Sequence, residues 1–287
     1  MWQIQKVADE GTAEPYVARL WAGAFELRDI LLRHRAANDA DFERRRQHFD
    51  NRYGPVLDAL GAARKRARAI QELLDTHRQK IVAKSIVSRQ RNAVQISETI
   101  TVPMQQHMAE FLSTTARAIK LLQELLSYLG VEVGFLFQTQ PRFSEGLERL
   151  RAAGQAELAD YVDSTRRGWS ETLIERRHAL EHKGWRLPDV RYLEQPDGSL
   201  LVVEPEVDGQ PITRFVATIL DRLLAFVEDM LAYAVQKGIV EVGDFIEIPK
   251  EDRDPANVKR FRFGVPALQP NEPFWHLQYG ERGFHDS

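Results

Sequence analysis

Apolar residues recur at helical spacing through most of the first 180 residues of this 287-residue chain. Each stretch with that spacing would bury one face of a helix against its neighbours. These stretches cover residues 15–37, 42–92, 102–129, 143–153 and 157–183. The second reads as one or two long helices, with Gly54-Pro55 as a break or a start, and Gly130 is placed to cap the third. The pattern predicts a helical bundle.

After residue 183 the helical spacing of apolar residues gives way to strand-like segments. Strand-like residues 190–193 and 200–203 flank Asp197-Gly198, which favours a tight β-hairpin turn. A long helix is expected at 212–236, and shorter strands at 240–248 and 259–263. The chain is therefore predicted to be mainly α, a helical bundle with an inserted β-hairpin and a small C-terminal β addition.

At 33.0 kDa the chain is long enough to bury a sizeable core. We expect one helical domain over residues 1–287. Within it, residues 1–100 would form N-terminal helices and residues 101–238 the core bundle. Residues 239–287 would supply strands and a proline-rich tail, extended from Pro266 onward.

Composition bears on the compartment. The chain has no cysteine, which excludes disulfides and thiolate metal sites and is compatible with a reducing cytoplasm. The first residues lack the basic-then-apolar pattern of a signal peptide. The most apolar helix, residues 212–235, is interrupted by acidic and basic residues and so does not read as a membrane span. We expect a cytoplasmic protein with no membrane partner.

One short segment, Arg177-His178-Ala179-Leu180-Glu181-His182, carries the residues best suited to chemistry. On a helical wheel, one stripe holds the apolar residues Leu158, Val162, Trp169, Leu173 and Leu180. His178 and His182 fall on the opposite side, with Glu181 beside them and Arg177 on the flank. This placement directs both histidines toward solvent or a partner.

An arginine is a permanent planar cation that suits a phosphate, and a histidine can accept and return a proton near neutral pH. Together they suffice for cleavage of RNA through attack by the ribose 2′-hydroxyl. His182 would act as a general base or acid, and Arg177 would stabilise charge on phosphorus. The expected product is a 2′,3′-cyclic phosphate, and neither a metal nor another cofactor is required.

The order arginine, polar residue, three further residues, histidine on a late helix resembles the HEPN superfamily. The resemblance implies catalytic positions for Arg177 and His182 and an accessory polar position for His178, with Glu181 and Arg176 in support. It also implies a homodimer, in which two Arg–His sets form one ribonuclease site. Because many members of that family are inactive or serve as antitoxins, it further allows a non-catalytic helical module that binds RNA or protein in a toxin–antitoxin or defence complex.

Two other interpretations of this segment stay open. Basic residues before Gly184 oppose the helix macrodipole, so the segment is also compatible with an ordinary solvated helix end. Its letters fit His-x-x-Glu-His as well, in which His178 and His182 would hold zinc and Glu181 would activate water. This spelling is the inverted zinc-protease motif. Proteases with that motif need a glutamate as third zinc ligand further along the chain, where residues 257–259 here are Asn, Val and Lys.

The net charge of −3 conceals a basic stretch. Residues 42–92 contain thirteen Lys and Arg against five Asp and Glu, an excess of +8. Such a stretch could follow an RNA backbone, and we expect its centre, Arg64, Lys65, Arg66 and Arg68, to bind RNA. The alternative is the solvated face of a long amphipathic helix.

Overall fold

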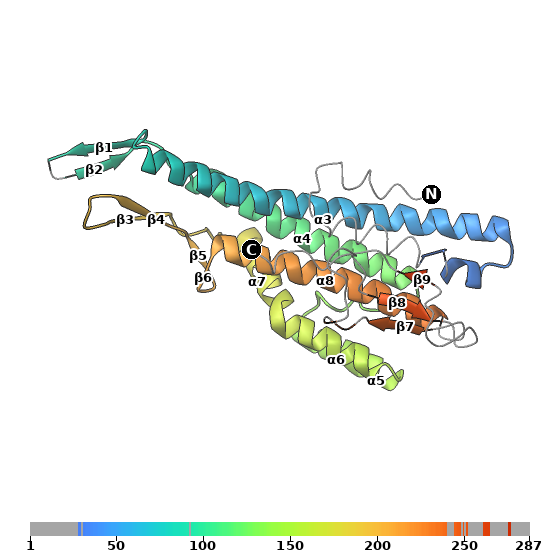
Figure 1. The fold of residues 1–287 in the computed structure, drawn as a ribbon. Coiled ribbons are helices and arrows are strands. Elements are labelled where there is room, and N and C mark those ends of the chain that lie inside the picture. The colour runs from blue at the N-terminus through green and yellow to red at the C-terminus, as the bar shows by residue number, and fades with distance from the viewer. Residues whose placement is uncertain are drawn as a thin grey trace. The chain divides into compact units, whose positions relative to one another are not determined.

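The computed structural model describes residues 28–29, 31–91, 93–239, 244–247, 249, 251, 261–264 and 275–276. Helices dominate this part of the chain (Figure 1). After a helical segment at 28–29 and 31–35, the helices are α3 (Asp39–Val82), α4 (Thr101–Tyr128), α5 (Gln140–Ala152), α6 (Ala156–Thr165), α7 (Glu171–His182) and α8 (Ile212–Ile239). A five-residue π-helical turn, Arg166–Ser170, joins α6 to α7.

The strands are short and antiparallel. They form three hairpins, β1–β2 (Val87–Gln90 and Ala93–Ile96), β3–β4 (Arg191–Glu194 and Leu200–Val203) and β5–β6 (Glu206–Val207 and Gln210–Pro211). Near the C-terminus, β7 (Asp244–Glu247), β8 (Phe261–Gly264) and β9 (Trp275–His276) form a three-stranded sheet in that order. The predicted fold class, mainly α with an inserted hairpin and a C-terminal β addition, is confirmed.

Several local signals act as expected. The Asp197-Gly198 turn joins β3 to β4, with Gly198 at φ 78° and the Ser199 amide donating to Asp197 Oδ1 at 2.8 Å. Gly130, at φ 86°, follows the end of α4, and the Val131 amide bonds to the Leu126 carbonyl there. The expected helices at 143–153 and 212–236 correspond to α5 and α8.

Other expectations need correction. Gly54-Pro55 neither breaks nor starts a helix, because α3 runs continuously through Pro55. Tyr53 and Val56, on either side of this pair, are buried, so tertiary packing outweighs the hydrogen bond that proline removes. The expected helix at 15–37 is described only at 28–29 and 31–35, and most of the expected tail lies outside the described residues.

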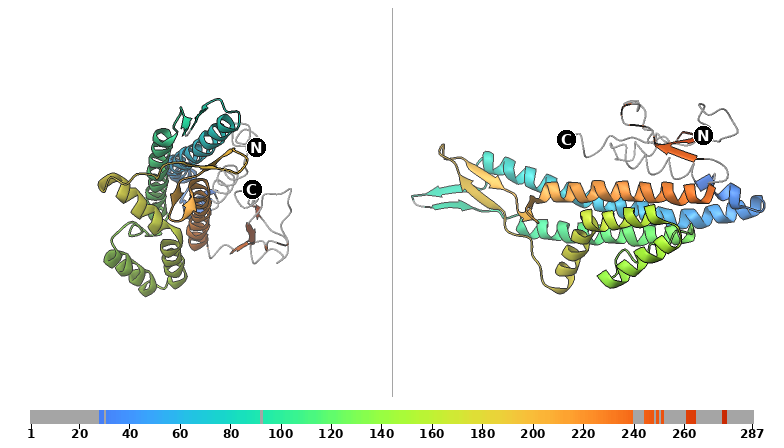
Figure 2. Two further views of the ribbon diagram at one scale, coloured as in Figure 1. Left: turned by 90° about the vertical axis from the view of Figure 1, so that its left-hand side faces the viewer. Right: turned by 90° about the horizontal axis from the view of Figure 1, so that it is seen from below.

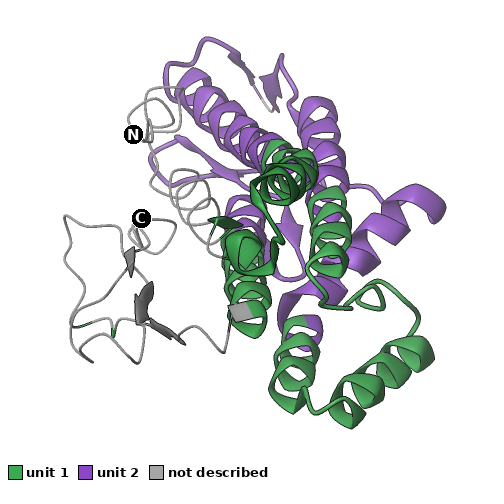
Figure 3. Cartoon of the chain, turned by 90° about the vertical axis from the view of Figure 1, so that its right-hand side faces the viewer, with its two compact units in different colours: residues 1–58, 117–165, 221–287 green, residues 59–116, 166–220 purple. Residues whose placement is uncertain are grey.

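The chain divides into two compact units, each built from separated segments (Figure 3). Unit 1 comprises residues 1–58, 117–165 and 221–287, and unit 2 comprises residues 59–116 and 166–220. Their boundaries fall inside α3, α4 and α8, so each of these long helices contributes to both units.

In unit 1, side chains from four helices pack together. The Tyr128 hydroxyl of α4 donates to the Arg45 carbonyl of α3 at 3.3 Å. Tyr161 of α6 stacks on Phe226 of α8 and donates to Asp229 Oδ2 at 2.8 Å. Helices α5 and α6 lie side by side, joined by a short turn (Figure 2). The core of this unit includes Phe49, Tyr53, Leu122, Leu125, Val162 and Val227.

In unit 2, the second half of α3 packs against the first half of α4, with an Arg66–Glu110 ion pair of 2.5 Å between them. The β1–β2 and β3–β4 hairpins lie next to each other, and Arg89 Nη1 donates to Glu194 Oε1 at 2.7 Å (Figure 1). Beyond β4, Glu204 accepts hydrogen bonds of 2.6 Å from Thr213 and Arg78. Burial alone would raise the pKa of Glu204, but these two hydrogen bonds lower it overall.

Candidate functional site on α7

Helix α7 is partly covered by the rest of the protein and exposed along one side. Leu173, in its first turn, is its one buried residue among the described part of the chain. Leu158, Val162 and Trp169 are buried as the wheel predicts, but Leu180 is partly exposed, so the expected apolar stripe does not reach the end of the helix. The preceding π-helical turn is a rare element that frequently occurs at functional sites.

The two histidines of the motif lie together on the open side of α7. His178 and His182 are both exposed, and 62% of the His182 side chain is accessible. Their ring centroids are 4.8 Å apart at an interplanar angle of 54°. The prediction that they face away from the core is confirmed, and the two imidazole rings lie on one patch of surface.

Glu181 lies between Arg177 and one of these histidines, His182. The Arg177 Nε donates to Glu181 Oε1 at 2.9 Å, and 27% of the Arg177 side chain is accessible. The other Glu181 oxygen lies 3.9 Å from His182 Nε2. Glu181 therefore lies between the Arg177 guanidinium and the His182 ring.

Arg176 points to a different neighbour. Its Nε donates to Asp208 Oδ2 at 2.9 Å, and a second guanidinium nitrogen bonds to the other oxygen of the same carboxylate. The hydrogen bond to Asp208 raises the pKa of Arg176. Asp208 belongs to the β5–β6 turn, so this bidentate pair fixes the Arg176 guanidinium beside α7.

Trp185, which follows the glycine at the end of α7, was not among the residues singled out from the sequence. Gly184 adopts φ 62°, and the Trp185 amide bonds back to the Ala179 carbonyl at 3.1 Å. The Trp185 ring is partly exposed, and the Arg176 guanidinium lies 5.9 Å from its centroid. A glycine cap followed by tryptophan was the available signal, because the turn returns the next residue toward the helix.

The four basic residues of α3 do not share one accessible surface. Arg64 is buried, with 6% of its area accessible, so it lies outside any basic face open to RNA. Arg66 pairs with Glu110. Lys65 and Arg68 are exposed. The alternation follows from the helical period, which places neighbouring positions of α3 on different sides.

No group of three His, Cys, Asp or Glu side chains in the described ranges could hold a metal ion. Residues 257–259, where the zinc interpretation would seek its further ligand, lie outside those ranges. Among the helices that the structure describes, none is both long and apolar enough to span a bilayer.

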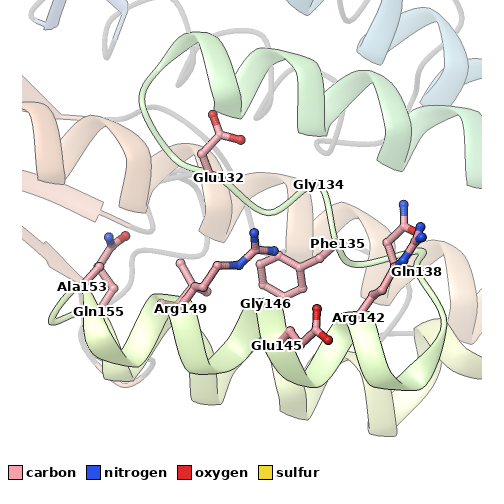
Figure 4. A pocket seen from close by; sticks show the side chains of 11 residues that line it. Glu132, Gly134, Phe135, Gln138, Arg142, Glu145, Gly146, Arg149, Ala153 and Gln155 are labelled. Atoms are coloured by element: carbon pink, nitrogen blue, oxygen red, sulfur yellow. The ribbon is translucent and has the colours of Figure 1, made fainter.

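A separate hollow of about 750 Å³ lies in unit 1, between α5 and the connector at residues 131–139. Figure 4 shows side chains of both charges around it, with Glu145 and Arg149 rising from α5 and Glu132 on the connector. Phe135 lies directly over Gly146 at its floor. None of the predicted site residues lines this hollow.

Comparisons of the chain with protein-family models, with curated proteins and with solved structures gave no match. The resemblance to the HEPN superfamily therefore rests on the α7 motif and on the helical fold.

Proposed function

We propose that this protein is a metal-independent endoribonuclease of the HEPN type, with Arg177 and His182 as its catalytic residues. The observation that carries the proposal is the exposed side of α7, where the ring centroids of His178 and His182 lie 4.8 Å apart and Glu181 lies between Arg177 and His182. Proton carriers beside a permanent cation are the groups that phosphodiester transfer needs.

In the proposed reaction the ribose O2′ attacks the adjacent phosphorus, forming the O2′–P bond while the P–O5′ bond breaks. One histidine accepts the proton of the 2′-hydroxyl, and another donates a proton to the departing O5′. The products are a 2′,3′-cyclic phosphate and a 5′-hydroxyl end. Arg177 balances the negative charge on the non-bridging oxygens in the transition state.

We further propose that the active form is a homodimer in which two α7 helices face each other. The exposed His178, Glu181 and His182 leave one side of α7 open to a partner, and two-fold dimers are the commonest oligomers. Pairing would bring two Arg–His sets to one phosphate, so an acid and a base could come from different protomers. An RNA substrate and the absence of cysteine both fit a cytoplasmic location.

One observation favours a second candidate, a non-catalytic relative that binds RNA or a partner protein in a toxin–antitoxin or defence complex. The Arg177 guanidinium already forms an ion pair with Glu181 within the same helix. A substrate phosphate must compete with that carboxylate for the arginine. In an inactive relative the Arg177–Glu181 ion pair would remain intact.

The test is cleavage of single-stranded RNA in EDTA by the wild-type chain and by Arg177→Ala and His182→Ala. We expect each variant to lose cleavage by about 100-fold or more, the usual cost of losing a charge stabiliser or a general acid–base. Arg117→Ala, which removes an exposed cation from α4, is the matched control and should keep most of the activity.

The end groups of the product identify the chemistry. A cyclic phosphate and a 5′-hydroxyl support attack by O2′. RNA binding without cleavage would instead support the non-catalytic relative. Activity that needs added zinc and is abolished by Glu181→Gln, while Arg177→Ala spares it, would overturn the metal-independent assignment.

A further inference from the structure

Trp185 is held at the surface immediately beyond the candidate catalytic helix. Gly184 at φ 62° turns the chain, and the Trp185 amide is tied to the Ala179 carbonyl inside α7. Two residues later, the Leu187 amide bonds to Gln105 Oε1 at 2.5 Å. The backbone on both sides of the indole is therefore anchored, three residues after His182 in the chain.

The ring differs from Trp169, which the same helical region buries. Trp169 is 8% accessible, whereas Trp185 is partly exposed. The Arg176 guanidinium lies 5.9 Å from the Trp185 centroid and is held there by Asp208. A cation near the face of an indole interacts favourably with the ring. Here Asp208 as well as the arginine side chain itself determines where the Arg176 guanidinium lies.

Exposed cations flank Trp185 in the chain. Lys183 and Arg186 are both exposed, one on each side of Gly184-Trp185. A partly exposed aromatic ring among cations is the combination by which proteins bind single-stranded nucleic acid, with a base on the ring and the backbone along the cations. Duplex RNA keeps its bases stacked inside and cannot use such a ring.

We propose that Trp185 forms a stacking subsite for one unpaired nucleobase of single-stranded RNA, and so positions the adjacent phosphodiester at the Arg177–His182 set. This inference rests on the proposed function for the position of the phosphate. The subsite accepts any base, because every base offers a stacking face. It therefore selects unpaired RNA over duplex without reading sequence.

The experiment uses a short single-stranded RNA that is 2′-O-methylated throughout, so that no 2′-hydroxyl can attack. Its dissociation constant is measured for the full-length wild type, Trp185→Phe and Trp185→Leu. Leucine retains an apolar side chain for packing but cannot stack. We expect Trp185→Leu to weaken binding by about 5- to 100-fold and Trp185→Phe to keep most of the affinity.

A second series replaces one base at a time by an abasic site. In wild type, one position should lose affinity most, and that position-specific loss should vanish in Trp185→Leu. With cleavable RNA, Trp185→Leu should raise KM and leave kcat little changed, because the stack holds ground state and transition state alike. A role confined to capping the helix predicts none of these dependences.

The outcomes separate the two proposals. If Trp185→Leu matches wild type in affinity, or its abasic profile is unchanged, the base subsite is rejected while cleavage can still support the ribonuclease. If the abasic dependence holds but no RNA is cut, the subsite stands and the nuclease assignment fails. Wild-type binding to duplex as tight as to single strands also rejects the subsite.

Discussion

The Nε2 atom of His77 on α3 lies 2.7 Å from the Tyr192 hydroxyl on β3, which ties the long helix to the β3–β4 hairpin inside unit 2. His77 is fully buried, and its ring centroid is 5.8 Å from that of Tyr192. Burial lowers the pKa of His77, with Glu98 opposing the shift and Lys80 adding to it. The neutral imidazole is therefore the form that the fold favours.

This pair predicts a pH-dependent stability. Because the folded pKa of His77 is below its unfolded value of about 6.5, the unfolded chain binds more protons as the pH falls below that value. The contribution of His77 is complete above about pH 6.5 and declines on acidification. We expect His77→Gln to cost more unfolding free energy at about pH 7.5 than at about pH 5.5, measured by urea titration. An equal cost at both pH values would contradict the assignment.

A prediction about packing concerns Gly146. A Cβ built there would lie 2.2 Å from Phe135 Cγ, so Gly146→Ala forces the aromatic ring off α5. We expect a loss of about 1–3 kcal/mol in unfolding free energy, the usual cost of overpacking.

The control for Gly146→Ala is Gly61→Ala in α3, where nothing lies within 4 Å of the added Cβ. Removing glycine from a helix interior should stabilise by about 0.5–1 kcal/mol. Thermal melts that move both variants in the same direction would refute the proposed clash.

The proposed dimer can be tested because the chain has no cysteine of its own. If two α7 helices face each other, His178→Cys should form an intermolecular disulfide under mild oxidation, since bridged Cα atoms must approach to within about 7 Å. Ser85→Cys, at an exposed position beyond α3, is the matched control. A monomer in sedimentation at micromolar concentration, or equal crosslinking of both variants, would count against the dimer.

The basic stretch of α3 gives a prediction about salt. If Lys65 and Arg68 contact phosphates, replacing both by Gln should flatten the log–log salt dependence of single-strand binding by about 1.4, or about 0.7 per phosphate. Arg66→Gln should change it less, because Glu110 already neutralises that arginine. Unchanged affinity in the double variant, with its circular dichroism spectrum preserved, would assign these charges to a solvated face.

Features with strong local signals were predictable from the sequence. The β3–β4 hairpin follows from Asp197-Gly198, and the end of α4 follows from Gly130. The β1–β2 hairpin was missed because Ser88 to Gln95 carries neither an Asx-Gly turn nor apolar alternation and continues a basic helical stretch. Its strands are mostly exposed, so burial leaves little trace in their sequence.

The part of the candidate site that depends on local helical spacing was predictable from the sequence. The exposure of His178 and His182 follows from their spacing within one helix. The bidentate hold of Asp208 on Arg176, and through it the setting of Trp185, joins residues 32 positions apart in the chain. Arg64 is buried by packing against other segments, which the local pattern of charges does not encode. Contacts between distant segments had to come from the structure.

The interleaving of the two units constrains how the chain can be made and cut. Any contiguous fragment that contains all of unit 2 also contains residues 117–165 of unit 1. No single truncation can therefore isolate one unit. During synthesis, residues 59–116 of unit 2 cannot complete their packing until residue 220 has been made. Unit 1 needs residues beyond 220 as well. The nascent chain therefore exposes incompletely packed helical surfaces for most of its translation, and such surfaces promote aggregation before synthesis is complete.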